Sequence, residues 1–141
     1  MVQLKQVNNH LNNKIMNKEY VMHIAQTIKE QLLSFTPMPV FMSWGVSEFV
    51  ATVFQELPAL RLKVNGRLHA GYVVIALNGS DYYEVYLLKE DDSNAKCVNE
   101  EVCFDELGDV IDRTIESGTD KEEYDKFCDQ QLAKLLSGTR A

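Results

Sequence analysis

The sequence predicts an α+β domain with an N-terminal helix, an antiparallel β-meander of four to five strands, and two C-terminal helices packed on one face of the sheet. Three observations lead to this fold class. A helical apolar stripe precedes two prolines, segments rich in β-branched and aromatic residues alternate with turns through the middle, and two more helical stripes follow. A chain of 141 residues fits one domain with its own hydrophobic core.

The first helix is expected over residues 18–34, within a single domain of residues 17–141. Asn17 suits the N-cap position, and Pro37 and Pro39 should end the helix because proline cannot continue the backbone hydrogen-bond ladder. Residues 1–16 are rich in asparagine, a poor helix former, and are expected to be a flexible arm or a frayed helix. The apolar stripe of the first helix consists of Val21, Ile24, Ala25, Ile28 and Leu32.

The middle of the chain predicts the sheet. The apolar pattern of the hairpin favours a three-residue loop with a bulge at Gly66, which pairs Leu62 with Leu68 and Leu60 with Ala70. The polar segment of residues 89–96 is expected to close the sheet region. Strands are expected at residues 40–46, 49–54, 72–77 and 82–88, with the hairpin at residues 60–70.

Two helices are expected after the sheet. The first is expected to end at Gly118, and the capping-box pattern of residues 119–122 should open the second, which ends at Gly138. The first stripe consists of Phe104, Leu107, Ile111 and Ile115, and the second of Tyr124, Phe127, Cys128, Leu132 and Leu135.

Cysteine usage and the absence of an apolar leader predict a cytoplasmic protein. The three cysteines (Cys97, Cys103 and Cys128) form no C-x-x-C pair, so we expect free thiols, with neither disulfides nor a metal site. The longest charge-free stretch, residues 31–47, is interrupted by two prolines and a glycine, which argues against a membrane span. No phosphate-binding glycine loop occurs, so no cofactor is expected.

Charge is distributed unevenly, and this predicts an acidic interaction surface. Residues 1–80 carry seven Lys and Arg against four Asp and Glu, whereas residues 81–141 carry seven against seventeen, a net charge of −10. Helices of this composition can dock onto a basic protein partner, although ordinary solvated helix faces have the same appearance. The candidate residues are Asp109, Asp112 and Glu116.

A second candidate surface is the sheet face opposite the core. Basic side chains can follow phosphates and tyrosines can stack on bases, so this face gives the alternative of a nucleic-acid-binding module. Alternation also places Val73, Ile75 and Glu84 on it, and a pI near 4.9 opposes the alternative because such modules usually carry a basic stripe. The candidate residues are Arg61, Lys63, Arg67, His69, Tyr82 and Tyr86.

Several short motifs carry a resemblance to a known group. They are Ser43-Trp44-Gly45, the run of residues 60–66, His69-x-Gly71, and the run of residues 77–85 that begins Leu-Asn-Gly-Ser-Asp. Over residues 40–88 the chain resembles small uncharacterised proteins of bacterial phage and mobile-element gene neighbourhoods. The resemblance implies a cytoplasmic accessory protein and assigns a role to no residue.

No catalytic constellation stands out in the sequence. Nucleophilic catalysis needs a cysteine or serine beside a histidine that a third group orients. His69 is expected on a strand between apolar residues, where a solvated histidine is the ordinary interpretation. The sequence therefore predicts a non-catalytic interaction or accessory protein with a protein partner.

Overall fold

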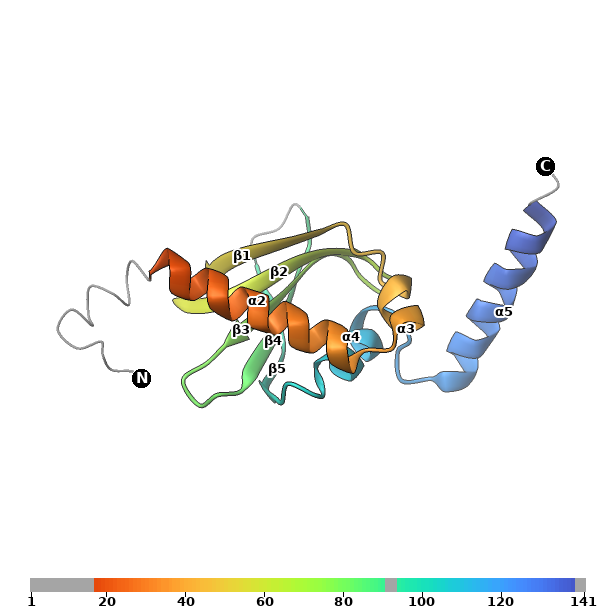
Figure 1. Cartoon of the computed structure of the whole chain (residues 1–141). Coiled ribbons are helices and arrows are strands. Elements are labelled where there is room, and N and C mark those ends of the chain that lie inside the picture. Colours follow the sequence, from red (N-terminus) through yellow and green to blue (C-terminus); the bar gives the residue numbers. More distant parts are fainter. Residues whose placement is uncertain (1–16, 91–93, 139–141) are drawn as a thin grey trace.

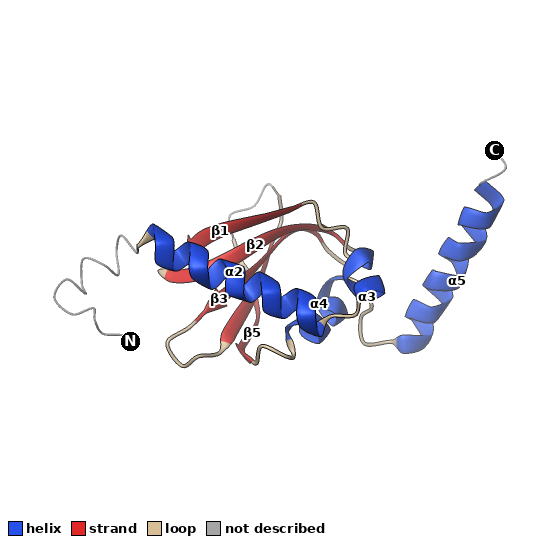
Figure 2. Ribbon diagram, in the orientation of Figure 1, coloured by secondary structure: helices blue, strands red, loops and turns tan. Residues whose placement is uncertain are grey.

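The structure is a computed structural model that describes residues 17–90 and 94–138 (Figures 1 and 2). It has a helix at its N-terminal end, a five-stranded antiparallel sheet and two C-terminal helices, which confirms the α+β class. The predicted arm of residues 1–16 lies outside the described residues. The elements are α2 (Lys18–Phe35), α3 (Met38–Ser43), β1 (Glu48–Phe54), β2 (Leu57–Asn65), β3 (Ala70–Leu77), β4 (Tyr83–Leu88), β5 (Lys96–Val102), α4 (Leu107–Ile115) and α5 (Lys121–Gly138).

The prediction for the first helix is confirmed. The Asn17 side chain accepts hydrogen bonds from the backbone N–H groups of Glu19 (2.7 Å) and Tyr20 (3.1 Å), as an N-cap should. The stripe faces the sheet, where Ile28 and Leu32 are fully buried. Figure 1 shows α2 lying across the sheet, where it packs mainly on β1 and β2, and it also contacts α4.

The expected strand at residues 40–46 is wrong, because this segment forms the short helix α3. Pro37 has a φ of −57° and its carbonyl accepts from the N–H groups of Val40 and Phe41, so the prolines that end α2 also begin α3. Trp44 follows α3 and is fully buried, with its indole N–H donating to Asp112 Oδ1 at 2.9 Å. Burial of the aromatic ring outweighs the β preference of the local sequence.

The sheet is a meander with strand order β1-β2-β3-β4-β5. Leu62 pairs with Val73 and Leu60 with Ile75, and these four side chains pack into the core beneath α2. The expected bulged pairing of Leu62 with Leu68 is therefore wrong, as is the placement of Val73 and Ile75 on the opposite face.

The reason for the different hairpin is a tertiary contact with α4. The loop of residues 66–69 is closed by a Gly66 N–H bond to the His69 carbonyl (3.0 Å), and the Leu68 N–H donates to the Ile115 carbonyl at 2.7 Å. Only glycine fits at position 66, because a Cβ there would overlap the Ile115 carbonyl. The end of α4 thus fixes the loop geometry, which local turn preferences cannot predict.

The strand β5 was not predicted, because the sequence around it is polar. Among its seven residues only Val102 is buried and Val98 half-buried, while the others are exposed. An edge strand buried on one side supplies little apolar signal, and charged side chains at an edge also discourage pairing with other chains.

The two C-terminal helices behave differently. Leu107, Ile111 and Ile115 of α4 are fully buried in the core, as expected, whereas Phe104 precedes the helix and is 46% exposed. The helix α5 is capped by Asp120, whose side chain accepts from the Glu123 N–H at 3.0 Å. It extends away from the sheet (Figures 1 and 2), so the expected packing of both helices on the sheet is wrong for α5.

Within residues 17–90 and 94–138, none of the helices has the length and apolar character needed to cross a bilayer.

Candidate interaction surfaces

The open face of the sheet is the face turned away from α2, and it carries two of the predicted basic residues. Arg61 forms an ion pair with Glu48 at 3.6 Å, and Lys63 forms one with Glu90 at 2.8 Å. The Arg61 guanidinium also lies 4.6 Å from the centre of the Tyr72 ring. Each of these two cations has a carboxylate partner that offsets its charge, which weakens the case for binding phosphate groups here.

Tyr86 lies on the open face, as predicted, but its polar end is already engaged. Its hydroxyl donates to Glu84 Oε1 at 2.7 Å, and the Asn78 amide donates to Glu84 Oε2 at 3.1 Å. The bond to Glu84, together with burial, raises the pKa of Tyr86. The ring packs against Phe54 with centroids 4.7 Å apart, so Tyr86 serves the fold more than it serves a ligand.

Tyr82 and His69 lie beside the open face. Tyr82 precedes β4, in the turn where its N–H donates to the Asn78 side chain at 3.2 Å, and it is 38% exposed. The ring nitrogen Nε2 of His69 lies 3.2 Å from the Tyr72 carbonyl oxygen. In the described part of the chain, no acidic or polar side chain orients the His69 ring as nucleophilic catalysis would require.

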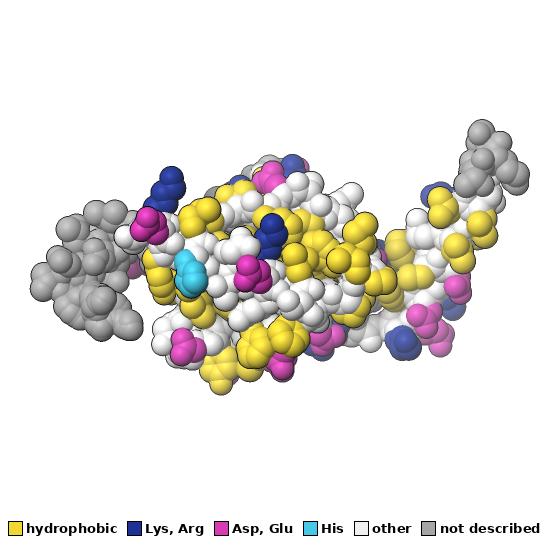
Figure 3. Space-filling view, viewed as in Figure 1, with side chains coloured by type: hydrophobic (Ala, Val, Ile, Leu, Met, Phe, Trp, Pro, Cys, Tyr) yellow, Lys and Arg dark blue, Asp and Glu magenta, His cyan; other side chains and the backbone are white. Residues whose placement is uncertain are grey.

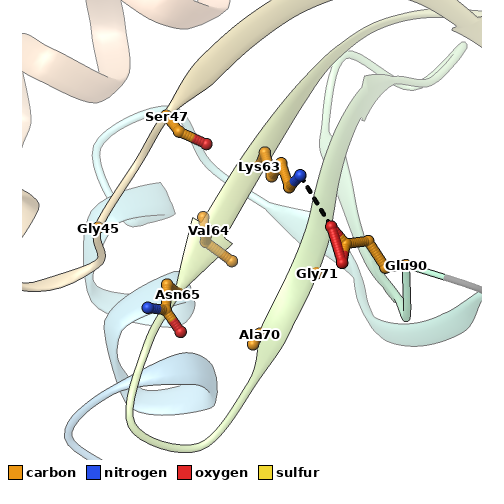
Figure 4. A pocket seen from close by; sticks show the side chains of 8 residues that line it. All are labelled: Gly45, Ser47, Lys63, Val64, Asn65, Ala70, Gly71 and Glu90. Carbon is orange, nitrogen blue, oxygen red and sulfur yellow. Dashed lines mark ion pairs between the residues drawn. The ribbon is translucent and has the colours of Figure 1, made fainter.

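A cavity of about 250 Å³ lies at one end of β2 and β3 (Figure 4). The ion pair of Lys63 and Glu90 spans one side of it, and the hydrogen bond and charge of Glu90 raise the pKa of Lys63. The charges of Lys63 and Glu90 at the cavity therefore neutralise each other. The lining residues are Gly45, Ser47, Lys63, Val64, Asn65, Ala70, Gly71 and Glu90.

Arg67 is not on the open face. It reaches across to the end of α4, where Nε donates to the Glu116 carbonyl (2.9 Å) and an NH2 group donates to the Ser117 carbonyl (3.0 Å). The other terminal nitrogen of Arg67 pairs with Glu123 at 3.1 Å. The guanidinium also lies 5.3 Å from the ring centres of Tyr124 and Phe127. We call this set of contacts the Arg67 clamp; its partners are Glu116, Ser117, Glu123, Tyr124 and Phe127.

The predicted acidic residues of α4 do not form one exposed surface. Asp109 is exposed and pairs with Arg113 at 3.0 Å. Asp112 is half-buried under the Trp44 indole. Glu116 is only 5% exposed and accepts from the Arg67 N–H (2.8 Å) and the Tyr124 hydroxyl (3.0 Å). Two of the three carboxylates, Asp112 and Glu116, are therefore engaged in hydrogen bonds that hold the fold together.

The cysteines are unbridged, and all three are exposed. The exposure of Cys128 differs from its expected place in the apolar stripe of the last helix. Partial desolvation by neighbouring atoms and the charge of Glu100 raise the pKa of Cys97, and partial desolvation with the charge of Glu106 raises the pKa of Cys103. A raised pKa disfavours the nucleophilic thiolate. Among the described residues, no group of three His, Cys, Asp or Glu side chains is placed to hold a metal ion.

The helix α5 carries large apolar side chains that are exposed. Leu132 and Leu135 are 56% and 64% exposed, and Figure 3 shows hydrophobic and acidic side chains on this helix where it stands apart from the body. Sequence reasoning expected a buried stripe here. The sequence feature that indicates exposure is the presence of four carboxylates within residues 121–129, which is more typical of a solvated helix than of a buried one.

Comparisons with protein-family models, with curated proteins and with solved structures found no match to this chain.

Proposed function

We propose that this protein is a non-catalytic interaction module whose folded body presents α5 to a protein partner. The observation that carries the proposal is the contrast along α5. Its first turns are held by the Arg67 clamp, while Leu132 and Leu135 further along are exposed. An apolar surface that is held in place and left uncovered is typical of a protein-binding site.

The clamp gives α5 a defined starting point. The guanidinium binds carbonyls at the end of α4, where the helix dipole favours a cation, and it lies against the aromatic pair Tyr124 and Phe127. The positive φ of Gly118 (+74°) lets the chain turn between the two helices. A helix that starts at a fixed place costs less entropy to dock than a free tail.

The nucleic-acid alternative has weaker support. Arg61 and Lys63 are paired with Glu48 and Glu90, and Arg67 lies in the clamp. Fluorescence anisotropy with labelled single-stranded DNA, duplex DNA and RNA at low salt tests it. We expect no binding; salt-sensitive binding that Arg61→Glu/Lys63→Glu abolishes would favour the alternative instead.

The wider role stays a prediction. An accessory protein of a phage or mobile element acting in the cytoplasm agrees with a small domain that works by docking. None of the comparisons bears on that assignment.

The test uses a photo-crosslinking residue placed at Leu135, or at Gln130 on the other side of α5 as a matched control. The full-length protein is irradiated in the cells that make it, and the crosslinked protein is identified and purified. We expect one dominant partner from Leu135 that binds the purified wild-type protein.

A double substitution, Leu132→Asp/Leu135→Asp, then gives the decisive comparison with Gln130→Asp/Ser137→Asp, which adds the same charge on the other side of the helix. We expect only the first to abolish binding. Equal crosslinking from both positions, or equal binding by both variants, would overturn the proposal.

A further inference from the structure

The apolar side chains of α5 form one continuous stripe with an acidic edge. Residues spaced three and four apart lie on the same side of a helix, which defines the α5 stripe as Tyr124, Cys128, Leu132 and Leu135. Asp125 and Asp129 each follow a stripe residue by one position, so they lie together along one edge, which we call the acidic edge. Both are exposed, and neither forms an ion pair within the described part of the chain.

The opposite edge of the stripe is covered, in the first turns of α5, by Arg67 of the folded domain. Arg67 pairs with Glu123 and lies over the rings of Tyr124 and Phe127, all on that edge of the helix. A docking segment therefore has to approach from the side that carries Leu132, Leu135 and the acidic edge. In this geometry, the apolar side chains of the docking segment contact Leu132 and Leu135, and its charged side chains contact the acidic edge.

A second copy of α5 is a poor occupant of this surface. A two-fold interface puts the same patch on both sides, so two antiparallel α5 helices would set one acidic edge against the other. Like charges placed opposite each other at an interface cost free energy and reject that partner. The side chains that would complement the acidic edge of α5 are a row of cations on the partner.

We propose that the segment that docks on α5 is a basic amphipathic helix of another protein. This inference rests on the proposed function and names the chemistry of its partner. Apolar side chains of that helix cover Leu132 and Leu135, and lysines or arginines along one of its edges pair with Asp125 and Asp129. Charge pairing sets the orientation, and apolar burial supplies most of the affinity.

The test uses two synthetic helical peptides of the length of α5. Both carry the same leucine stripe, but one has lysines along a single edge and the other has glutamates at those positions. Binding to the full-length protein is measured by isothermal titration calorimetry at low and physiological salt. We expect the lysine peptide to bind at least about tenfold more tightly than the glutamate peptide, and to weaken as salt rises.

Variants locate the charge effect. Asp125→Asn/Asp129→Asn should weaken the lysine peptide about tenfold, whereas Glu56→Gln/Glu101→Gln, which removes two exposed charges from the body, should leave binding unchanged. Equal affinity for the two peptides, or no binding of either, overturns the basic partner. The crosslinking test of α5 still judges the proposed function separately. Self-association of the protein that Leu132→Asp/Leu135→Asp abolishes also overturns this inference, because the occupant would then be a second copy.

Discussion

The helices α4 and α5 are neighbours in the chain, and both carry an apolar stripe, yet one lies in the core and the other in solvent. Leu107, Ile111 and Ile115 of α4 are fully buried, while Leu132 and Leu135 of α5 are more than half exposed. The difference teaches that periodicity identifies the apolar side of a helix but does not identify what covers it. For α4 the cover is the sheet and α2, whereas α5 has only its first turns against the body.

Deleting core volume from α4 should produce the largest effect. Ile111→Ala removes three carbons from a fully buried side chain, and we expect it to lower the free energy of unfolding by about 2–5 kcal/mol. Urea denaturation measures the loss, with Leu132→Ala as the exposed counterpart. Similar losses in the two variants would contradict the division between a packed and an uncovered helix.

Breaking the junction between the helices should have an intermediate effect. Glu116→Ala leaves the Arg67 N–H and the Tyr124 hydroxyl without their acceptor, at an expected cost of about 1–3 kcal/mol. Amide hydrogen exchange should also accelerate in the first turn of α5. Glu116→Gln keeps an oxygen acceptor, so it should retain part of the stability and part of the protection of α5 amides from exchange. Unchanged exchange in Glu116→Ala would mean that the junction does not hold α5.

Alkaline pH should weaken the packed core, where Tyr83 of β4 lies, and the junction of α4 with α5, where Tyr124 lies. Burial raises the pKa of Tyr83, and burial with the bond to Glu116 raises that of Tyr124, whereas an unfolded tyrosine has a pKa of about 10. The unfolded state therefore releases these protons first. The stability is complete below pH 10 and is lost as the pH rises above it.

Thermal denaturation between pH 8 and 11 measures this slope. We expect Tyr124→Phe to flatten it, because a phenylalanine has no proton to release. A slope that is identical in the wild type and in Tyr124→Phe would show that the hydroxyl has the same pKa in both states.

The fold class and the first helix could be predicted because their signals are local. The N-cap at Asn17 and the stripe through Leu32 need only neighbouring residues. The helix α3 and the loop of residues 66–69 could not, because burial of Trp44 and the carbonyl of Ile115 decide them from far away in the sequence.

The candidate site shows the same division. Alternation placed Arg61, Lys63 and Tyr86 on one sheet face correctly, since strand periodicity is local. It could not show that Glu48 and Glu90 neutralise the two cations, or that Arg67 turns away to the end of α4. These partners lie 13, 27 and 49 residues apart in the sequence, and the packed structure alone brings them together.

The smallest effect on stability should come from α5 itself. Leu132→Asp/Leu135→Asp should change the free energy of unfolding by less than about 0.5 kcal/mol, because both side chains lose little burial. The control Gln130→Asp/Ser137→Asp adds the same charges to the same helix and accounts for their effect on it. If the leucine variant were destabilised as strongly as Ile111→Ala while the control was not, the leucines would be core residues of the isolated protein. A near-zero difference between the two variants instead leaves Leu132 and Leu135 available to a partner, since side chains that add nothing to folding can gain their burial only on binding.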